Sequence, residues 1–100
     1  MSNPSPMQKY VVEFIGTFFF LSVIIFTGHP LAIGAALALS IYVGGKISGG
    51  NFNPAVTIMM AVGDKMPLAN AVPYVIAQIA GGLVALLAYI TFKKSNTKLF

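Results

Sequence analysis

Residues 47–57 read Ile-Ser-Gly-Gly-Asn-Phe-Asn-Pro-Ala-Val-Thr, and this stretch decides how the chain folds. Its first half is rich in glycine and amide side chains, which do not favour a continuous helix. A helix can begin at Asn53-Pro54, because asparagine is a favoured N-cap residue and proline suits the first helical position. The apolar run that follows, residues 54–62, rises about 1.5 Å per residue and is less than half as long as a bilayer core. The stretch therefore predicts a short helix entered through an irregular loop.

Long uncharged stretches lie on both sides of this loop. No Asp, Glu, Lys or Arg occurs in residues 14–45 or 66–92, and the 100-residue chain is 57% hydrophobic and 8% charged. Each stretch is longer than the ~20 apolar residues that one helical span needs. A soluble domain of this size would need more charge on its surface. We therefore predict an integral, multi-pass membrane protein, whose particular membrane the sequence does not indicate.

The predicted fold is all-α, with three transmembrane helices and one re-entrant half-helix. Gly28, His29 and Pro30 interrupt the first uncharged stretch, because proline disfavours a helical residue before it, and we assign His29 no role. The expected segments are a polar tail at 1–9, spans at 10–27, 31–45 and 67–92 within a membrane domain at 10–92, a re-entrant loop at 46–63, and a basic tail at 93–100.

Small residues recur at every fourth position of the second and third spans, so each set lies on one helix face. Such faces let helices approach closely where lipid provides no hydrophobic force between them. The two sets are Ala32, Ala36, Ser40 and Gly44, and Ala77, Gly81 and Ala85. We expect both faces to pack against neighbouring helices.

The loop's polar backbone is tolerated at membrane depth only if it is buried in protein or lines a wet cavity. The half-helix would direct its positive dipole end and the Asn53 amide into the membrane, where they attract lone pairs and repel cations. A pore narrowed at this point would pass neutral hydrogen-bonding molecules and oppose protons and metal ions. An isolated Asn-Pro pair is an ordinary helix start, and the glycine-rich approach and flanking spans favour the functional interpretation.

The run 47–57 resembles the first NPA loop of the major intrinsic proteins, the family of aquaporins and glycerol facilitators. Residues 13–18, 31–34 and 74–82 resemble parts of the family's first three helices, in the same order and spacing. Members have six spans in two inverted halves, whose NPA half-helices meet in the pore. The resemblance therefore implies half of an aquaporin fold, of the N-terminal type.

The resemblance also implies pore-lining and selectivity positions, namely Asn53, Pro54, Ala55, Ile33 and Val56. Ile33 stands where water-selective members usually carry an aromatic residue. Val56 follows this NPA, whereas members carry an arginine after their second NPA, and this chain has none. A pore built from such chains would lack the usual filter, which leaves water, glycerol, urea and ammonia open as solutes.

Glu13 and Gln78 match family residues that brace the pore loops through hydrogen bonds. Two alternatives stay open: Glu13 could snorkel to the membrane interface, and Gln78 could bond simply to a neighbouring helix. Lys46 and Asn51 replace residues that are often histidine in the family. Lys46 would either deter cations at the channel mouth or be an ordinary solvated lysine.

A single half would expose its half-helix to lipid, so the sequence predicts a partner. Inverted repeats suggest a second copy inserted upside down, as an antiparallel homodimer. Three lysines are expected on each side of the membrane, and this lack of a positive-inside bias is what dual orientation requires. They are Lys9, Lys46 and Lys65 on one side, and Lys93, Lys94 and Lys98 on the other. A second half-channel chain is the alternative partner, and the chain could also be a piece of a longer product.

The predicted function is a passive transmembrane channel for water or small neutral solutes, assembled from two or more half-units in the lipid bilayer. The alternatives are a non-conducting structural or assembly membrane protein, and one half of a hetero-oligomeric channel. The sequence holds no nucleophile–base pair, metal cluster or phosphate loop, so we predict no enzyme activity, cofactor or metal. Its lysines do not form the basic face of a nucleic-acid binder.

Overall fold

The computed structural model describes residues 3–99, with side chains as far as Ser95, and helices are the only regular secondary structure in this part of the chain. The helices are α1 (Pro6–Thr27), α2 (Pro30–Ser48), α3 (Pro54–Val62) and α4 (Leu68–Leu99). Helices α1, α2 and α4 are long and apolar enough to cross a membrane, whereas α3 has 9 residues. The predicted all-α fold, with three spans and one half-helix, is therefore confirmed.

Helix α1 begins four residues before the predicted start of the first span, so the second half of the expected tail at 1–9 is helical. The reason is a capping box at Ser5. The Gln8 N–H donates to Ser5 Oγ (3.2 Å), and the Ser5 N–H donates to Gln8 Oε1 (2.8 Å). These reciprocal bonds satisfy two otherwise unpaired donors and fix the helix start at Pro6.

The other helix boundaries also shift from the predicted ones. Helix α2 runs past Gly45 to Ser48 and ends at Gly49, whose φ of 92° is the left-handed conformation typical of a C-cap glycine. At its start, His29 Nδ1 accepts the Ala32 N–H (3.4 Å), so His29 caps α2. Helix α4 continues to Leu99, and the expected tail at 93–100 is helical over 93–99, because residues 83–99 contain no glycine or proline to stop it.

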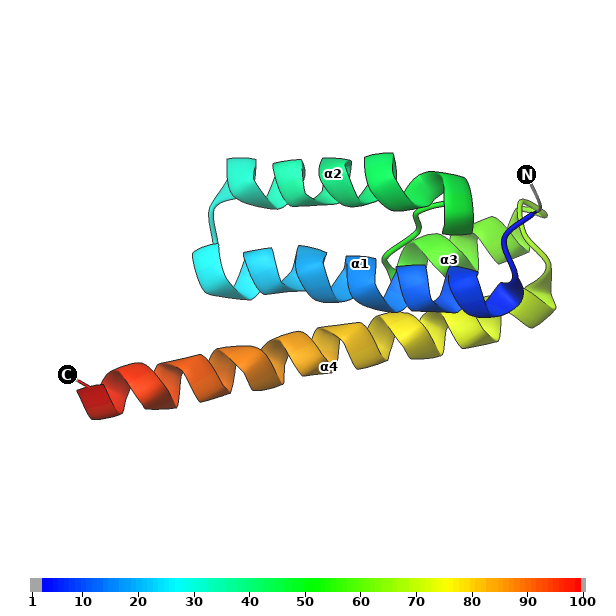
Figure 1. Cartoon of the computed structure of the whole chain (residues 1–100). Coiled ribbons are helices and arrows are strands. Elements are labelled where there is room, and N and C mark those ends of the chain that lie inside the picture. Colours follow the sequence, from blue (N-terminus) through cyan, green and yellow to red (C-terminus); the bar gives the residue numbers. More distant parts are fainter. Residues whose placement is uncertain (1–2, 100) are drawn as a thin grey trace.

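Helix α1 occupies the centre of the bundle, with α2 packed on one side and α4 on the other, while α3 packs on α4 (Figure 1). The small-residue faces lie in these contacts: Ala36, Ser40 and Gly44 on α2 and Gly81 and Ala85 on α4 are buried. Ala32 and Ala77 are only half-buried.

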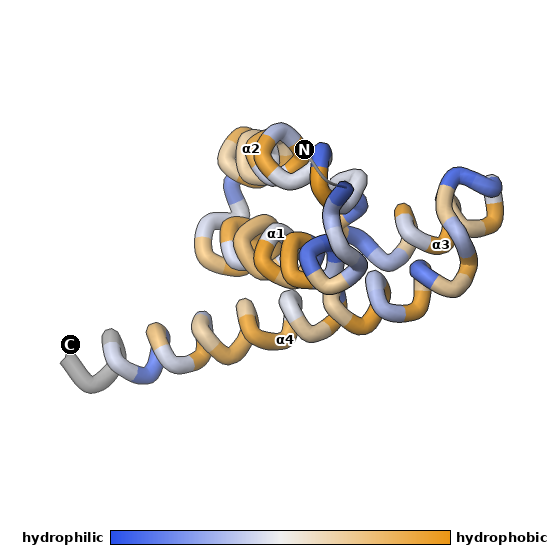
Figure 2. The backbone as a smooth tube through the Cα atoms, turned by 45° about the vertical axis from the view of Figure 1, so that its right-hand side comes forward, coloured by the Kyte–Doolittle hydropathy of each residue, from blue (hydrophilic) through white to orange (hydrophobic). Residues whose placement is uncertain are grey.

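Hydrophobic residues predominate along the three long helices, and hydrophilic residues lie mainly near the ends of the helices and in the turns, among them the turn between α3 and α4 (Figure 2). Large apolar side chains such as Leu31, Ile76 and Leu87 are exposed, while Glu13, Thr57 and Gln78 are buried. A hydrocarbon surrounding accepts such an apolar exterior without penalty, and it requires the polar groups to be satisfied inside.

We predict that Gly81→Ala destabilises the contact between α1 and α4. A Cβ at Gly81 would lie 2.7 Å from the Phe14 carbonyl oxygen and 3.0 Å from the Phe18 nitrogen, and backbone atoms cannot move aside cheaply. Overpacking of this kind typically lowers the free energy of unfolding by about 1–3 kcal/mol. Denaturant titration of the variant in detergent micelles would measure the loss. Gly34→Ala is the matched control, because its Cβ would meet nothing within 4 Å. An equal effect of the two substitutions would contradict the assigned contact.

Candidate functional site

The loop between α2 and α3 turns sharply because three of its residues have left-handed backbone conformations. The φ angles are 92° at Gly49, 69° at Gly50 and 53° at Phe52. Glycine adopts this conformation freely, but phenylalanine does so at a cost that the surrounding structure must offset. The loop is therefore held from outside rather than shaped by its own preferences.

The Glu13 carboxylate of α1 holds the loop backbone. Its Oε1 accepts the Phe52 N–H (2.8 Å) and the Gln78 Nε2–H (2.7 Å). Its Oε2 accepts the Asn51 N–H (3.1 Å) and the Ser48 hydroxyl (2.7 Å). Glu13 has 0% of its surface exposed, so it lies inside the bundle and does not snorkel to the interface. One buried side chain thus links α1, the end of α2, the loop and α4.

A second set of hydrogen bonds ties the same loop to α3 and α4. Thr57 Oγ1 accepts the Gln78 Nε2–H (2.7 Å) and the Asn51 Nδ2–H (3.0 Å). The Tyr74 hydroxyl donates to the Ser48 carbonyl (2.6 Å). Gln78 therefore hydrogen-bonds both to the Glu13 carboxylate, which holds the loop, and to Thr57 of α3. It does not bond only to a neighbouring spanning helix.

Thr57 is a site residue that the sequence reasoning missed. It is 0% exposed and is the only polar side chain within α3 (Pro54–Val62). An isolated hydroxyl in an otherwise apolar half-helix is the signal that could have found it, because a buried hydroxyl requires a hydrogen-bond partner.

Phe52 is a second residue that the sequence reasoning missed. Its ring fills the interface between α1 and α2 opposite Gly16 and Gly44, and only 1% of the residue is exposed. A Cβ at Gly16 would lie 2.6 Å from Phe52 Cδ1, and a Cβ at Gly44 would lie 3.2 Å from Phe52 Cζ. The missing side chains of two glycines therefore make room for the ring that anchors the loop.

The structure brings four of the five predicted pore positions together at the start of α3. Asn53 and Ala55 are exposed there, and Pro54 and Val56 are half-buried. Asn53 Oδ1 accepts the Ala55 N–H (2.8 Å), which turns the amide oxygen towards its own helix and leaves Nδ2 directed away. The fifth position, half-buried Ile33, lies in the first turn of α2, about 20 Å along that helix from the loop.

Lys46 is exposed in the last turn of α2 and does not join these groups. Asn51, in contrast, is buried and contributes both its backbone N–H and its side-chain amide to the network. Within residues 3–99, no group of three or more His, Cys, Asp or Glu side chains lies close enough together to hold a metal ion.

Three spanning helices and a half-helix that begins in a braced loop define an integral membrane protein with a re-entrant segment. The chain belongs to the major intrinsic protein family, whose model matches residues 24–100. The predicted membership of this family is therefore confirmed. No solved structure matches the chain significantly.

Curated relatives support the same assignment. The chain is 45% identical over 86% of its length to glycerol uptake facilitator protein-like 6 of Lactiplantibacillus plantarum. It is 40% identical over 79% of its length to aquaporin Z of Bradyrhizobium diazoefficiens. It is 37% identical over 79% of its length to nodulin-26 of Glycine max. These matches cover 44%, 39% and 34% of the respective relatives, so the chain spans less than half the length of each.

We predict that Glu13→Gln strongly destabilises the fold. A glutamine keeps one acceptor oxygen, and its NH₂ group would face two of the four donors that now bond to Glu13. Each unsatisfied buried group costs about 1–3 kcal/mol, so the free energy of unfolding should fall by about 2–4 kcal/mol. Thr17→Val, one turn further along α1, is the control, because Thr17 Oγ1 is buried without a partner among the described residues and its loss should cost little. A glutamine variant as stable as the valine variant would contradict the bracing.

We also predict that Gly16→Ala displaces the Phe52 ring and that Phe52→Leu in the same chain restores part of the loss. The new Cβ would overlap the ring, and such overpacking costs about 1–3 kcal/mol. The double variant should lose less free energy of unfolding than the two single variants lose together, because substitutions of residues in contact are usually not additive. Gly45→Ala is the control, because its Cβ would meet Ile41 at an ordinary 3.7 Å. Strictly additive effects would show that the ring does not lie against Gly16.

Proposed function

We propose that the chain forms one half of a passive transmembrane channel for water or small neutral solutes such as glycerol. The observation that carries the proposal is the contrast within the NPA loop. Its other polar side chains are buried and hydrogen-bonded, whereas the Asn53 amide is exposed at the start of α3, with Nδ2 directed away from the helix. An oriented donor of this kind beside a positive helix end suits a lone pair of a passing neutral molecule and opposes cations.

The residues around this donor favour a permissive channel over a strictly water-selective one. Val56 and Ile33 are apolar, and no arginine is available to narrow the pore or to hydrogen-bond a solute. The names of the relatives fit either solute class, since one is a glycerol uptake facilitator and others are aquaporins. We therefore extend the proposal to glycerol and to solutes of similar size.

The second half of the pore is proposed to be another copy of the chain in the opposite orientation. The exposed Asn53 of each copy would then meet near the membrane centre, as the two NPA half-helices of full-length members do. The three lysines at each end give neither orientation an electrostatic advantage. In the two alternatives, the second half of the pore would come from a different chain or from a further segment of a longer product.

The experiment is osmotic shrinkage of liposomes that contain only the purified chain, followed by light scattering with sucrose and then glycerol as osmolyte. We expect water efflux well above that of empty liposomes, and glycerol re-entry. Asn53→Ala should lower the permeability roughly three- to ten-fold, because it removes one hydrogen bond to the passing solute, which contributes about 1 kcal/mol. Asn3→Ala, at an exposed position before α1, is the control. Folded, inserted protein that conducts no better than empty liposomes would contradict a homomeric channel and favour a non-conducting assembly role or a missing partner.

Orientation is tested separately in the same liposomes. The chain has no cysteine, so single cysteines at Asn3 and His29, at opposite ends of α1, can be labelled with a membrane-impermeant reagent. Each should be labelled about equally from the two sides. Labelling of each from one side only would exclude the antiparallel copy and leave the channel proposal with a different second half.

A further inference from the structure

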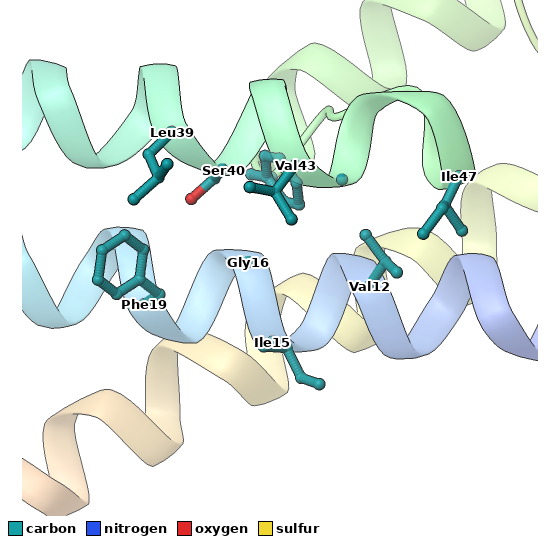
Figure 3. A pocket seen from close by; sticks show the side chains of 10 residues that line it. Val12, Ile15, Gly16, Phe19, Leu39, Ser40, Val43 and Ile47 are labelled. Atoms are coloured by element: carbon teal, nitrogen blue, oxygen red, sulfur yellow. The ribbon is translucent and has the colours of Figure 1, made fainter.

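Two adjoining hollows lie on the surface of the bundle. The first is a groove of about 360 Å³ between α1 and α2 (Figure 3), and the second is a hollow of about 500 Å³ at the end of the bundle that carries the start of α1. Ile47 lines both, and Lys9 of the end hollow is one helical turn from Val12 of the groove. The two hollows therefore adjoin at Ile47 and together make up one two-part surface feature.

The groove suits hydrocarbon. Its walls are aliphatic and aromatic side chains from α1 and α2, chiefly Val12, Ile15, Phe19, Leu39, Val43 and Ile47. The polar group at its wall, the Ser40 hydroxyl, already donates to the Ala36 carbonyl (2.8 Å). From Lys9 to Phe19 the feature extends about 15 Å along α1, which is half the ~30 Å thickness of a bilayer core and hence one leaflet.

The end hollow suits an anion. Lys9 and Lys65 line it together with the polar side chains of Asn70 and Tyr74, and neither Glu13 nor Asp64 is among its lining residues. Lys65 stands in a tight turn, in which its N–H donates to the Met60 carbonyl (2.8 Å). All the elements that meet here lie at the end of the bundle where the lipid headgroups are expected (Figure 1).

We propose that this feature binds one anionic phospholipid, with its phosphate between Lys9 and Lys65 and an acyl chain in the groove between α1 and α2. The two lysines of the end hollow match the negative phosphate, and the apolar walls of the groove match an acyl chain. The length of the feature matches the thickness of one leaflet. The helical walls of the groove come from α1 and α2 and not from α3, so Asn53 remains available. The site nevertheless adjoins the loop that positions Asn53, since Phe52 lines the groove and Asn51 lines the end hollow.

The test measures the association of spin-labelled phosphatidylglycerol and phosphatidylcholine with the whole chain in phosphatidylcholine vesicles, from the motionally restricted fraction in the electron paramagnetic resonance spectrum. Phosphatidylglycerol should be preferred, and Lys9→Gln or Lys65→Gln should each lower the preference roughly five-fold, the worth of one lysine near an anionic headgroup. Lys46→Gln is the control, because Lys46 is exposed at the same end of the bundle and does not line the hollow.

The groove is tested by Val43→Trp, which would fill it. The restricted fraction of both lipids should fall, whereas Ile76→Trp, at a similarly exposed position of α4 (63% against 66% for Val43), should leave it unchanged. An equal loss of preference in all three lysine variants would reduce the effect to general surface charge and overturn the proposal. Displacement by millimolar inorganic phosphate, with no effect of Val43→Trp, would show a free-phosphate site instead. A change in oligomeric state with Val43→Trp, at unchanged lipid binding, would show that a second copy covers the groove.

Discussion

The structure depends on the buried carboxylate of Glu13. Removing a carboxylate from water costs several kcal/mol unless its oxygens are fully hydrogen-bonded, and here each oxygen accepts two bonds. The donors come from the end of α2, from the loop and from α4, so the position of one side chain of α1 constrains all three. The loop amides in turn require an acceptor, because Asn51 and Phe52 are buried and a buried N–H without a partner costs about 1–3 kcal/mol. Carboxylate and loop therefore stabilise each other, and neither could be buried alone.

The rest of the fold makes room for this network. Close backbone approach at Gly81 places α4 beside α1, so that Gln78, one turn earlier, reaches both Glu13 and Thr57. Gly16 and Gly44 leave the space that the Phe52 ring fills on the other side of α1. The ring holds the loop by packing and the carboxylate holds it by hydrogen bonds. Together they set the start of α3, and with it the exposed Asn53 amide on which the proposed channel function rests.

The elements and the network were predictable to different degrees. Uncharged stretches and Asn53-Pro54 define three spans and a half-helix, because hydrocarbon thickness sets segment length directly. Resemblance to the family pointed to Glu13 and Gln78 but not to their partners. The helix start at Pro6 depends on reciprocal Ser5 and Gln8 bonds that the polar composition of the tail conceals. Phe52 and Thr57 were missed because their burial depends in part on Gly16 and Gln78, which are distant in the sequence and close only in the folded bundle.

Amide hydrogen exchange in lipid nanodiscs, followed residue by residue with NMR, can test whether Glu13 holds the loop backbone. The Asn51 and Phe52 amides belong to no helix, yet both donate to Glu13. If Glu13 holds the loop, both amides exchange as slowly as amides in the middle of α1, and much faster in Glu13→Gln. Fast exchange at both positions in the unaltered chain would contradict this role of Glu13.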